Sequence, residues 1–157
     1  MVIKVLAVGK IKETFFQEAI NEYSKRLSKY TKVEIIEILE EKIPEENASY
    51  IEIAKTKEGE RILKKINDNE QVVLLDLRGQ ALDSLGFADI IDKLKAKGGT
   101  IDFVVGGSYG VSNDVYKRAN QVVRFSKLTF PHQLFRVVLL EQIYRSFKIL
   151  NNEKYHK

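Results

Sequence analysis

The residues best suited to hold a ligand lie in the last third of the chain, and glycine dominates the first group of them. Gly106 to Gly110 read GGSYG directly after TIDFVV, an apolar run typical of a buried strand. A glycine pair at the end of a strand lets the backbone approach a ligand closely, because no Cβ stands in the way. GGSYG has neither the spacing of a dinucleotide fingerprint nor the Gly-Lys-Ser/Thr end of a phosphate loop. The motif therefore disfavours a dinucleotide or a triphosphate as the ligand.

Two further segments also have the character of strand ends. Leu75 to Gly79 read LDLRG, and Phe125 to Phe130 read FSKLTF. In open α/β sheets, ligands bind at the carboxyl ends of the strands. A glycine after a strand is often only a turn, so each segment alone says little. The three segments together predict one ligand pocket.

Few residues of this chain are suited to metal binding or nucleophilic catalysis. The chain has no cysteine and only two histidines, His132 and His156. This excludes disulfides, thiolate metal sites, a thiol nucleophile and a histidine-rich zinc site. We expect no metal, and nothing resembles a Ser-His-Asp triad. His132 opens a predicted helix, where the helix dipole disfavours protonation, so we interpret it as a structural, hydrogen-bonding histidine.

Positive charge is concentrated towards the end of the sequence. The whole chain carries a net charge of +4. Residues 1–80 hold 14 basic and 15 acidic side chains, whereas residues 115–157 hold nine basic and two acidic ones, a sum of +7. Aromatic side chains alternate with the basic ones in the second range. Such a surface suits contact with a nucleic-acid backbone and stacking on bases; a solvated charged face is the alternative.

Strand-like and helix-like segments alternate along the 157 residues, of which 44% are hydrophobic and 31% charged. This predicts one α/β domain over residues 1–157, with a mainly parallel sheet and helices on both faces. The second helix is predicted to begin at Ser49, in a capping box with Glu52. The predicted strands are 2–8, 33–39, 71–77, 101–105 and 122–125, and the predicted helices are 13–30, 49–66, 84–97, 112–120 and 131–150.

The last predicted helix is apolar around nearly its whole circumference between Leu134 and Leu140. A helix of this kind is buried on more than one side, which in a small domain favours a homodimer. The apolar N-terminal stretch VIKVLAV contains Lys4 and is too short to span a membrane. We therefore expect a cytoplasmic protein without a membrane segment.

Several motifs of this chain resemble one family. AVGK at Ala7 to Lys10, EYSKRL at Glu22 to Leu27, GGSYG, and the long segment FSKLTFPHQLFRVVLLEQIYRSFKI ending in YHK are similar to the RlmH family. Members are bacterial methyltransferases of the SPOUT superfamily that modify large-subunit ribosomal RNA. The resemblance runs the whole length of the chain.

The resemblance implies a fold, a cofactor and a substrate. The C-terminal part would form a deep trefoil knot, and a homodimer would hold S-adenosylmethionine in that knot. The methyl acceptor would be N3 of a pseudouridine in 23S ribosomal RNA of the assembled ribosome. By position, the residues expected to contact the cofactor are Leu75, Gly106, Gly107, Phe125, Ser126, Lys127, Leu128, Thr129 and Phe130.

Methyl transfer from a sulfonium needs alignment of the acceptor and removal of the N3 proton. A neutral histidine suits the second task, so we assign His156 as the base and Tyr155 as a residue that stacks on the acceptor. Arg136 or Arg145 is expected to hold phosphate. Two alternatives remain: a non-catalytic RNA-binding factor for ribosome assembly, and an enzyme that binds a nucleotide or dinucleotide, which the missing glycine fingerprint disfavours.

Overall fold

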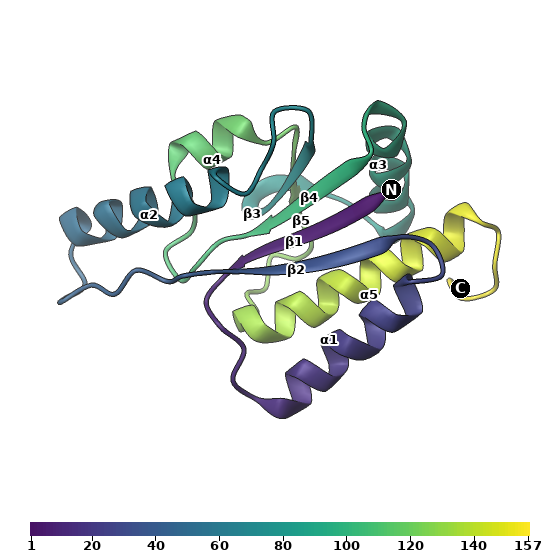
Figure 1. The fold of residues 1–157 in the computed structure, drawn as a ribbon, viewed down its shortest axis with the longest axis horizontal. Coiled ribbons are helices and arrows are strands. Elements are labelled where there is room, and N and C mark those ends of the chain that lie inside the picture. Colours follow the sequence, from purple (N-terminus) through teal and green to yellow (C-terminus); the bar gives the residue numbers. More distant parts are fainter.

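The computed structural model describes residues 1–157 and contains one five-stranded sheet in which every pairing is parallel. From one edge to the other, the strands follow the order β2-β1-β4-β3-β5 (Figure 1). The predicted α/β fold with a parallel sheet is confirmed. The strands are β1 (Val2–Val8), β2 (Lys32–Ile38), β3 (Gln71–Ala81), β4 (Thr100–Val105) and β5 (Gln121–Arg124).

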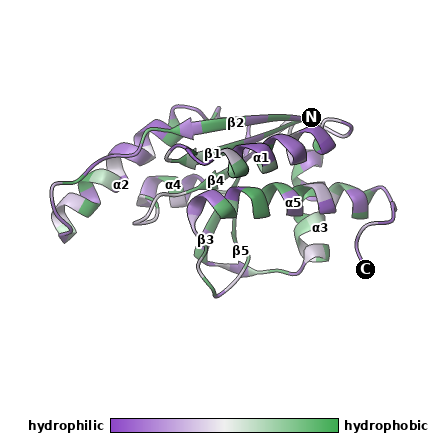
Figure 2. Cartoon of the chain, turned by 90° about the horizontal axis from the view of Figure 1, so that it is seen from below, coloured by the Kyte–Doolittle hydropathy of each residue, from purple (hydrophilic) through white to green (hydrophobic).

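Helices cover both faces of this sheet, as predicted. On one face α5 (His132–Leu150) lies between α1 (Thr14–Leu27) and α3 (Ser84–Lys97), and Figure 2 views the molecule from this side. The other face is covered by α2 (Ala48–Leu63) and the short α4 (Asn113–Arg118). No helix is long and apolar enough to cross a membrane.

Burial on both faces explains why the central strands are apolar at nearly every position. In β1, Val5 packs into the core beneath α1, α3 and α5, while its neighbour Leu6 packs into the smaller core beneath α2 and α4. Successive side chains of a strand point to opposite faces, so a strand covered on both sides needs apolar residues at odd and even positions alike.

The start of α2 differs from the prediction. Asn47, not Ser49, is the N-cap: its backbone is extended, and its side chain accepts a hydrogen bond from the backbone N–H of Tyr50. Asparagine is a strong N-cap residue, and a helix that begins two residues earlier places Ser49 in the first turn. The capping box with Glu52 is therefore wrong.

β3 also departs from the prediction, because it continues past Leu77 to Ala81. The residues after Leu75 leave the ladder, and both Leu75 and Gln80 pair with Val123 of β5. Within this excursion, Gly79 lies directly against the backbone of β5. A Cβ at this position would come within 2.6 Å of the Val123 nitrogen and 2.7 Å of the Val122 carbonyl carbon. Only glycine permits this approach, which is closer than any real side chain tolerates.

A buried ionic cluster lies towards the amino-terminal ends of the strands. The Lys4 Nζ is 2.6 Å from Glu70 Oε1 and 3.6 Å from Asp102 Oδ1. Asp102 is fully buried, and neither of its carboxylate oxygens accepts a hydrogen bond. Burial raises the pKa of Asp102 to about 7. Burial also acts to raise the pKa of Glu70, but hydrogen bonds from Lys4 and Asn67 outweigh it, and the pKa is lowered.

Candidate functional site

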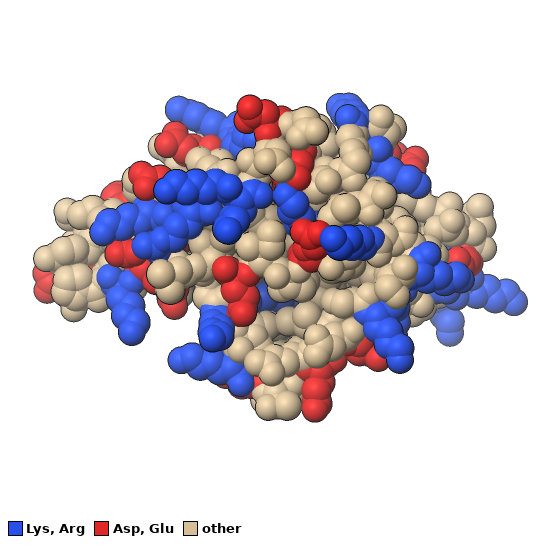
Figure 3. All heavy atoms as spheres, in the orientation of Figure 1, with Lys and Arg blue, Asp and Glu red and all other residues tan.

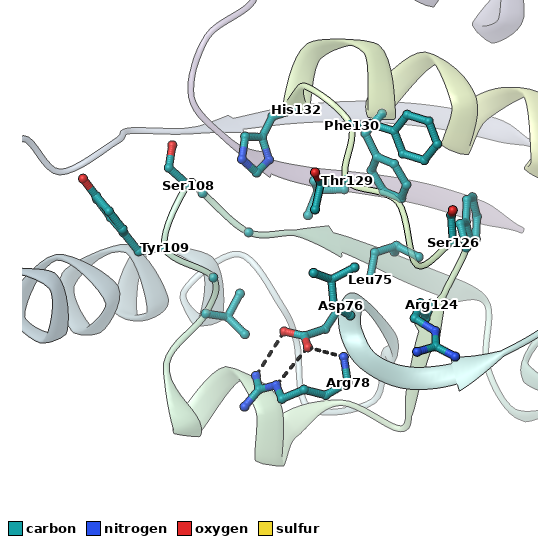
Figure 4. Close-up of a pocket in the computed structure, with 18 of the residues that line it drawn as sticks. Leu75, Asp76, Arg78, Ser108, Tyr109, Arg124, Ser126, Thr129, Phe130 and His132 are labelled. Atoms are coloured by element: carbon teal, nitrogen blue, oxygen red, sulfur yellow. Dashed lines mark hydrogen bonds and ion pairs between the residues drawn. The ribbon is translucent and has the colours of Figure 1, made fainter.

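The three predicted strand ends lie side by side in the fold. β4, β3 and β5 are neighbours in the sheet, so the segments that follow their carboxyl ends surround a single cavity of about 550 Å³. This volume lies within the range of small-molecule sites. His132 and Phe135 at the start of α5 close the cavity on one side (Figure 4).

The cavity contains nearly all of the residues expected to hold a cofactor. Lys127 is the exception, because its exposed side chain lies outside the cavity on the same loop. The expected residues that do line it are Leu75, Gly106, Gly107, Phe125, Ser126, Leu128, Thr129 and Phe130.

An aromatic cluster forms one wall of the cavity. The ring centroid of Phe125 lies 5.3 Å from that of Phe135 and 5.0 Å from that of Phe87, and Phe130 stacks on Phe135 at 6.4 Å. Phe87 belongs to the buried core, so the wall is fixed from behind. Together with Leu75 and the backbone groups at the strand ends, it offers apolar contact and hydrogen bonds without an unpaired carboxylate. This set fits a purine nucleoside that carries a sulfonium.

The glycine loop is shaped by contacts within the protein. A Cβ on Gly106 would lie 2.8 Å from the Cγ1 of Val111, and a Cβ on Gly107 would lie 3.1 Å from both Val8 and Glu58. Gly110 has a positive φ of 86° with open space around it. The glycine pair therefore lets the loop pack closely against Val111, Val8 and Glu58 of its own chain.

Helix α2 supports this loop from behind. A Cβ on Gly59 would lie 2.3 Å from the Oγ of Ser112, the N-cap of α4, so the two elements touch at this glycine. The neighbouring Glu58 is buried beside Gly107, and burial raises its pKa. The Tyr109 hydroxyl donates a hydrogen bond to Glu46 at 2.8 Å. Contacts from residues 46–59 thus fix the loop, which sequence spacing alone did not indicate.

Asp76 and Arg78 form an ion pair at the cavity rim. The carboxylate accepts hydrogen bonds from Nε of Arg78 at 2.9 Å, from Nη2 at 3.0 Å and from the Arg78 backbone N–H at 2.9 Å. These bonds hold the pKa of Asp76 below its usual value. The guanidinium also lies over the ring of Tyr116, 4.5 Å from its centroid. Asp76 therefore positions Arg78 and is not free to accept a proton.

His132 points into the cavity and makes no hydrogen bond with the protein, so its interpretation as a hydrogen-bonding residue is wrong (Figure 4). Burial lowers its pKa, and the nearby guanidinium of Arg136 lowers it further. His132 is consequently a neutral imidazole at pH 7, with both ring nitrogens available to a ligand.

The structure does not place Arg136 where it could hold a phosphate. Its side chain is 2% exposed, and Nη2 donates hydrogen bonds to the carbonyls of Val8 at 2.9 Å and Gly9 at 2.8 Å. Glu37 lies 3.5 Å from Nη1. The guanidinium thus connects α5 to the loop after β1. The prediction that Arg136 holds a phosphate of the RNA is therefore wrong.

The C-terminal residues fold back beside α5. The Tyr155 hydroxyl donates a hydrogen bond to Glu141 at 3.0 Å, and the guanidinium of Arg145 lies 4.7 Å from the centre of its ring. His156 is exposed, and its Nδ1 is 3.4 Å from the Nη1 of Arg145. Tyr155 is thus partly covered, whereas His156 is exposed.

His156 lines a second cavity of about 410 Å³. Phe125, Ser126 and Phe130 line this cavity as well as the first, so a single wall separates the two. The second cavity also has apolar sides contributed by Leu82, Leu85 and Val138. The structure therefore brings His156 to the far side of the wall of the expected cofactor site.

A parallel α/β sheet with a nucleoside-sized cavity at three adjacent strand ends defines the class of protein: an enzyme or binding protein for a small cofactor. The model of the family described as predicted SPOUT methyltransferase matches residues 1–156. The chain therefore belongs to the SPOUT methyltransferase family, and the family resemblance of its motifs is confirmed. Enzymes of this family use S-adenosylmethionine.

Relatives with names refine this assignment. The chain is 57% identical to ribosomal RNA large subunit methyltransferase H of Clostridium botulinum (strain Okra / Type B1) and 52% identical to the protein of the same name from Clostridium kluyveri; in both comparisons 100% of each chain is covered. Among solved structures, a probable methylase family protein from Haemophilus influenzae Rd KW20 matches with a TM-score of 0.55 at 12% identity, covering 99% of this chain and 70% of that one. The last comparison shows the fold alone.

Proposed function

We propose that this protein, acting as one methyltransferase domain over residues 1–157, transfers a methyl group from S-adenosylmethionine to N3 of a pseudouridine in 23S ribosomal RNA of the assembled ribosome. The observation that carries the proposal is the joining of three strand ends into one cavity, in a chain that matches named ribosomal RNA methyltransferases over its full length. Because the substrate is the ribosome, the enzyme works in the cytoplasm.

The first cavity is the cofactor site in this proposal. Backbone groups at Leu75, Gly106 and Gly107 and the loop 125–130 would hold the nucleoside, and the aromatic wall would exclude water from it. When bound, S-adenosylmethionine supplies an electrophilic methyl group. The protein's own task is then to place the acceptor nitrogen in line with that group and to take its proton.

His156 is the residue we assign to the proton, from its position on the second cavity. A guanidinium can only donate, so Nδ1 of His156, 3.4 Å from Nη1 of Arg145, can act as the acceptor of this contact. The histidine must release Arg145 before Nδ1 can accept the N3 proton. Tyr155 donates a hydrogen bond to Glu141, and Arg145 covers one face of its ring. The other face of the ring would stack on the base.

The proposed enzyme is a homodimer joined through α5. Leu134 is 38% exposed, although it belongs to a helix that is apolar almost all round. Leu139, by contrast, is fully buried within its own chain, so a charge there would test folding and not association. Leu134→Glu should shift the protein from dimer to monomer in sedimentation velocity at micromolar concentration. Leu39→Glu, at a position 72% exposed directly after β2 and outside α5, is the matched control and should leave the dimer intact.

The trefoil knot expected from the family is also part of this proposal. Its support is the excursion of β3, where the backbone at Gly79 lies so close to β5 that a Cβ would come within 2.6 Å of the Val123 nitrogen. A chain that lies so close to a later strand is compatible with threading of the C-terminal third. An experimental structure in which residues 120–157 can be withdrawn without passing through a loop would contradict it.

Mass spectrometry of 23S ribosomal RNA tests the proposed reaction directly. In a strain that lacks this gene, one pseudouridine should lose a methyl group, and the purified enzyme with S-adenosylmethionine should restore it on isolated ribosomes. Isothermal titration calorimetry separates this function from a non-catalytic assembly factor, which would bind ribosomes without binding the cofactor. Unchanged ribosomal RNA in the deletion strain would contradict the proposal.

A further inference from the structure

The rim of the cofactor cavity carries an excess of positive charge that the cofactor does not require. Three basic side chains line the cavity from three different elements: Lys55 of α2, Arg78 of β3 and Arg124 of β5. Asp76 is the only acidic residue of the lining, and it is bound to Arg78. Lys55 also forms an ion pair, with Glu52 at 3.1 Å, but that carboxylate is 69% exposed and lies outside the lining. Arg124 forms no ion pair, so the rim carries more positive charge than a cofactor with one carboxylate and a positive sulfonium requires.

Arg78 is held in a fixed orientation with one edge free. Asp76 occupies Nε and Nη2, and the ring of Tyr116 covers one face of the guanidinium. Its Nη1 makes no hydrogen bond. The side chain of Arg78 is 57% exposed, whereas that of Asp76 is 13% exposed, so the pair buries its anion and presents its cation. An arginine fixed in this way loses little side-chain entropy when it binds a phosphate.

Arg124 continues the positive rim beyond the cavity. It makes no ion pair, and Lys127, three residues further along, is exposed outside the cavity. Figure 4 shows Arg78 and Arg124 on the side of the cavity away from His132. In Figure 3, further basic side chains gather over α2, from which Lys55 comes. A row of cations that extends from a pocket onto the surface suits a polyanion, because successive phosphates each need a partner.

We infer that Lys55, Arg78 and Arg124 form a phosphate-binding arc, which holds the RNA backbone next to the nucleotide that enters the site. The inference rests on the proposed function and adds to it a docking surface distinct from the C-terminal residues. Exposed Leu77 and Leu128 stand at the same rim and offer apolar contact to sugars and bases. The arc positions the substrate and takes no part in the proton transfer.

Steady-state methylation of ribosomes from the deletion strain tests the arc. Arg78→Gln with Arg124→Gln should raise KM for ribosomes about tenfold and leave kcat within about twofold, because only docking is lost. The plot of log KM against log salt concentration should become shallower by about 1.4–1.8, the slope of two phosphate contacts. Lys95→Gln, an exposed lysine on α3 without an ion pair, is the matched control and should change neither value.

Two measurements keep the outcomes separate. If the cofactor affinity of the double variant, measured by calorimetry, falls by the same factor as KM rises, the arginines bind the cofactor's carboxylate and the inference is overturned. An unchanged KM and salt slope overturn it as well. Co-sedimentation with ribosomes measures binding directly. A wild-type protein that binds ribosomes but does not methylate them would contradict the proposed function, and a comparison of its binding with that of the double variant would still test the arc. Arg124→Gln alone removes no ion pair and serves if the double variant is unstable.

Discussion

The two ends of the sheet differ in whether their buried carboxylates lie beside an accessible cation. Near the amino-terminal ends of the strands, Lys4, Glu70 and Asp102 form a closed cluster in which Asp102 is fully buried. At the carboxyl ends, Asp76 is also largely covered, but it is bound to Arg78, whose guanidinium reaches the surface beside a cavity of about 550 Å³.

The comparison shows that a strongly shifted pKa is not by itself the mark of a functional site. The pKa of Asp102 is raised to about 7 by burial, yet no ligand can reach it. The carboxyl end is identified as the site by its cavity, by the meeting of three strand ends and by the basic side chains that line its rim. Accessibility, and not the size of the shift, separates the two ends.

Removal of residues 155–157 should have the largest effect, and only at the carboxyl end. Without His156 and Tyr155, the rate of ribosome methylation should fall by about 10²–10⁴-fold, the range lost with a general base. Cofactor affinity, measured by calorimetry, should stay within about twofold, because these residues do not line the first cavity.

His156→Ala refines this test. The single change should lower kcat by about 10²-fold, and a higher pH should restore part of the rate, because N3 then ionises without help. Methylation at the wild-type rate by the truncated enzyme would show that the base lies elsewhere, and His132 in the first cavity would be the next residue to examine.

Asp102→Asn should act only at the amino-terminal end, and on stability alone. The folded pKa of Asp102 is raised to about 7, so the wild-type protein loses stability as pH rises towards 7 and the buried carboxyl ionises. From about pH 5 to about pH 8, the advantage of the variant over wild type in unfolding free energy should grow by on the order of 2 kcal/mol. One pKa unit corresponds to about 1.4 kcal/mol, and Lys4 offsets part of the cost of the buried charge.

Urea unfolding at several pH values and fixed protein concentration measures this gain. The lowered pKa of Glu70 affects stability only in more acidic solutions, as pH falls below its unfolded value, so it does not disturb the chosen window. The methylation rate should not change. A pH-independent difference between variant and wild type would mean that Lys4 keeps Asp102 ionised throughout.

A smaller effect is expected from one glycine at each end of β4. Gly107→Val places a branched side chain 3.1 Å from Val8 and Glu58, so the loop must shift and cofactor affinity should fall about tenfold, or about 1.4 kcal/mol. Gly99→Val is the matched change at the amino-terminal end, where a Cβ meets nothing within 4 Å, and it should leave affinity unchanged. Calorimetry on both folded variants compares them; equal affinities would remove the glycine loop from the cofactor site.

The sequence predicted the parallel sheet and the pocket because both depend on local pattern. Apolar runs such as TIDFVV mark strands buried on both faces, and glycine or polar residues mark their ends. Once the strands are parallel, their carboxyl ends must share one edge of the sheet. The strand order that places β4, β3 and β5 side by side was not readable, because it depends on contacts between distant segments.

Arg136 and Gly79 show the same limit at single positions. Arginine in a basic region is usually exposed, so its burial against the carbonyls of Val8 and Gly9 could not be foreseen. Gly79 follows Arg78 as a turn glycine would, yet it lies inside a longer strand, where any side chain would collide with the backbone of β5. In both cases the deciding partner lies more than forty residues away in the chain.

Phe125, Ser126 and Phe130 line both cavities, so a shift of this wall by a ligand in one cavity reaches the other. A ligand that displaces this wall on one side changes the shape of the other side. Reciprocity then requires that the factor by which bound cofactor alters the affinity for ribosomes equals the factor by which ribosomes alter the affinity for cofactor. Substitution of one side chain in this wall should therefore change both titrations by the same factor.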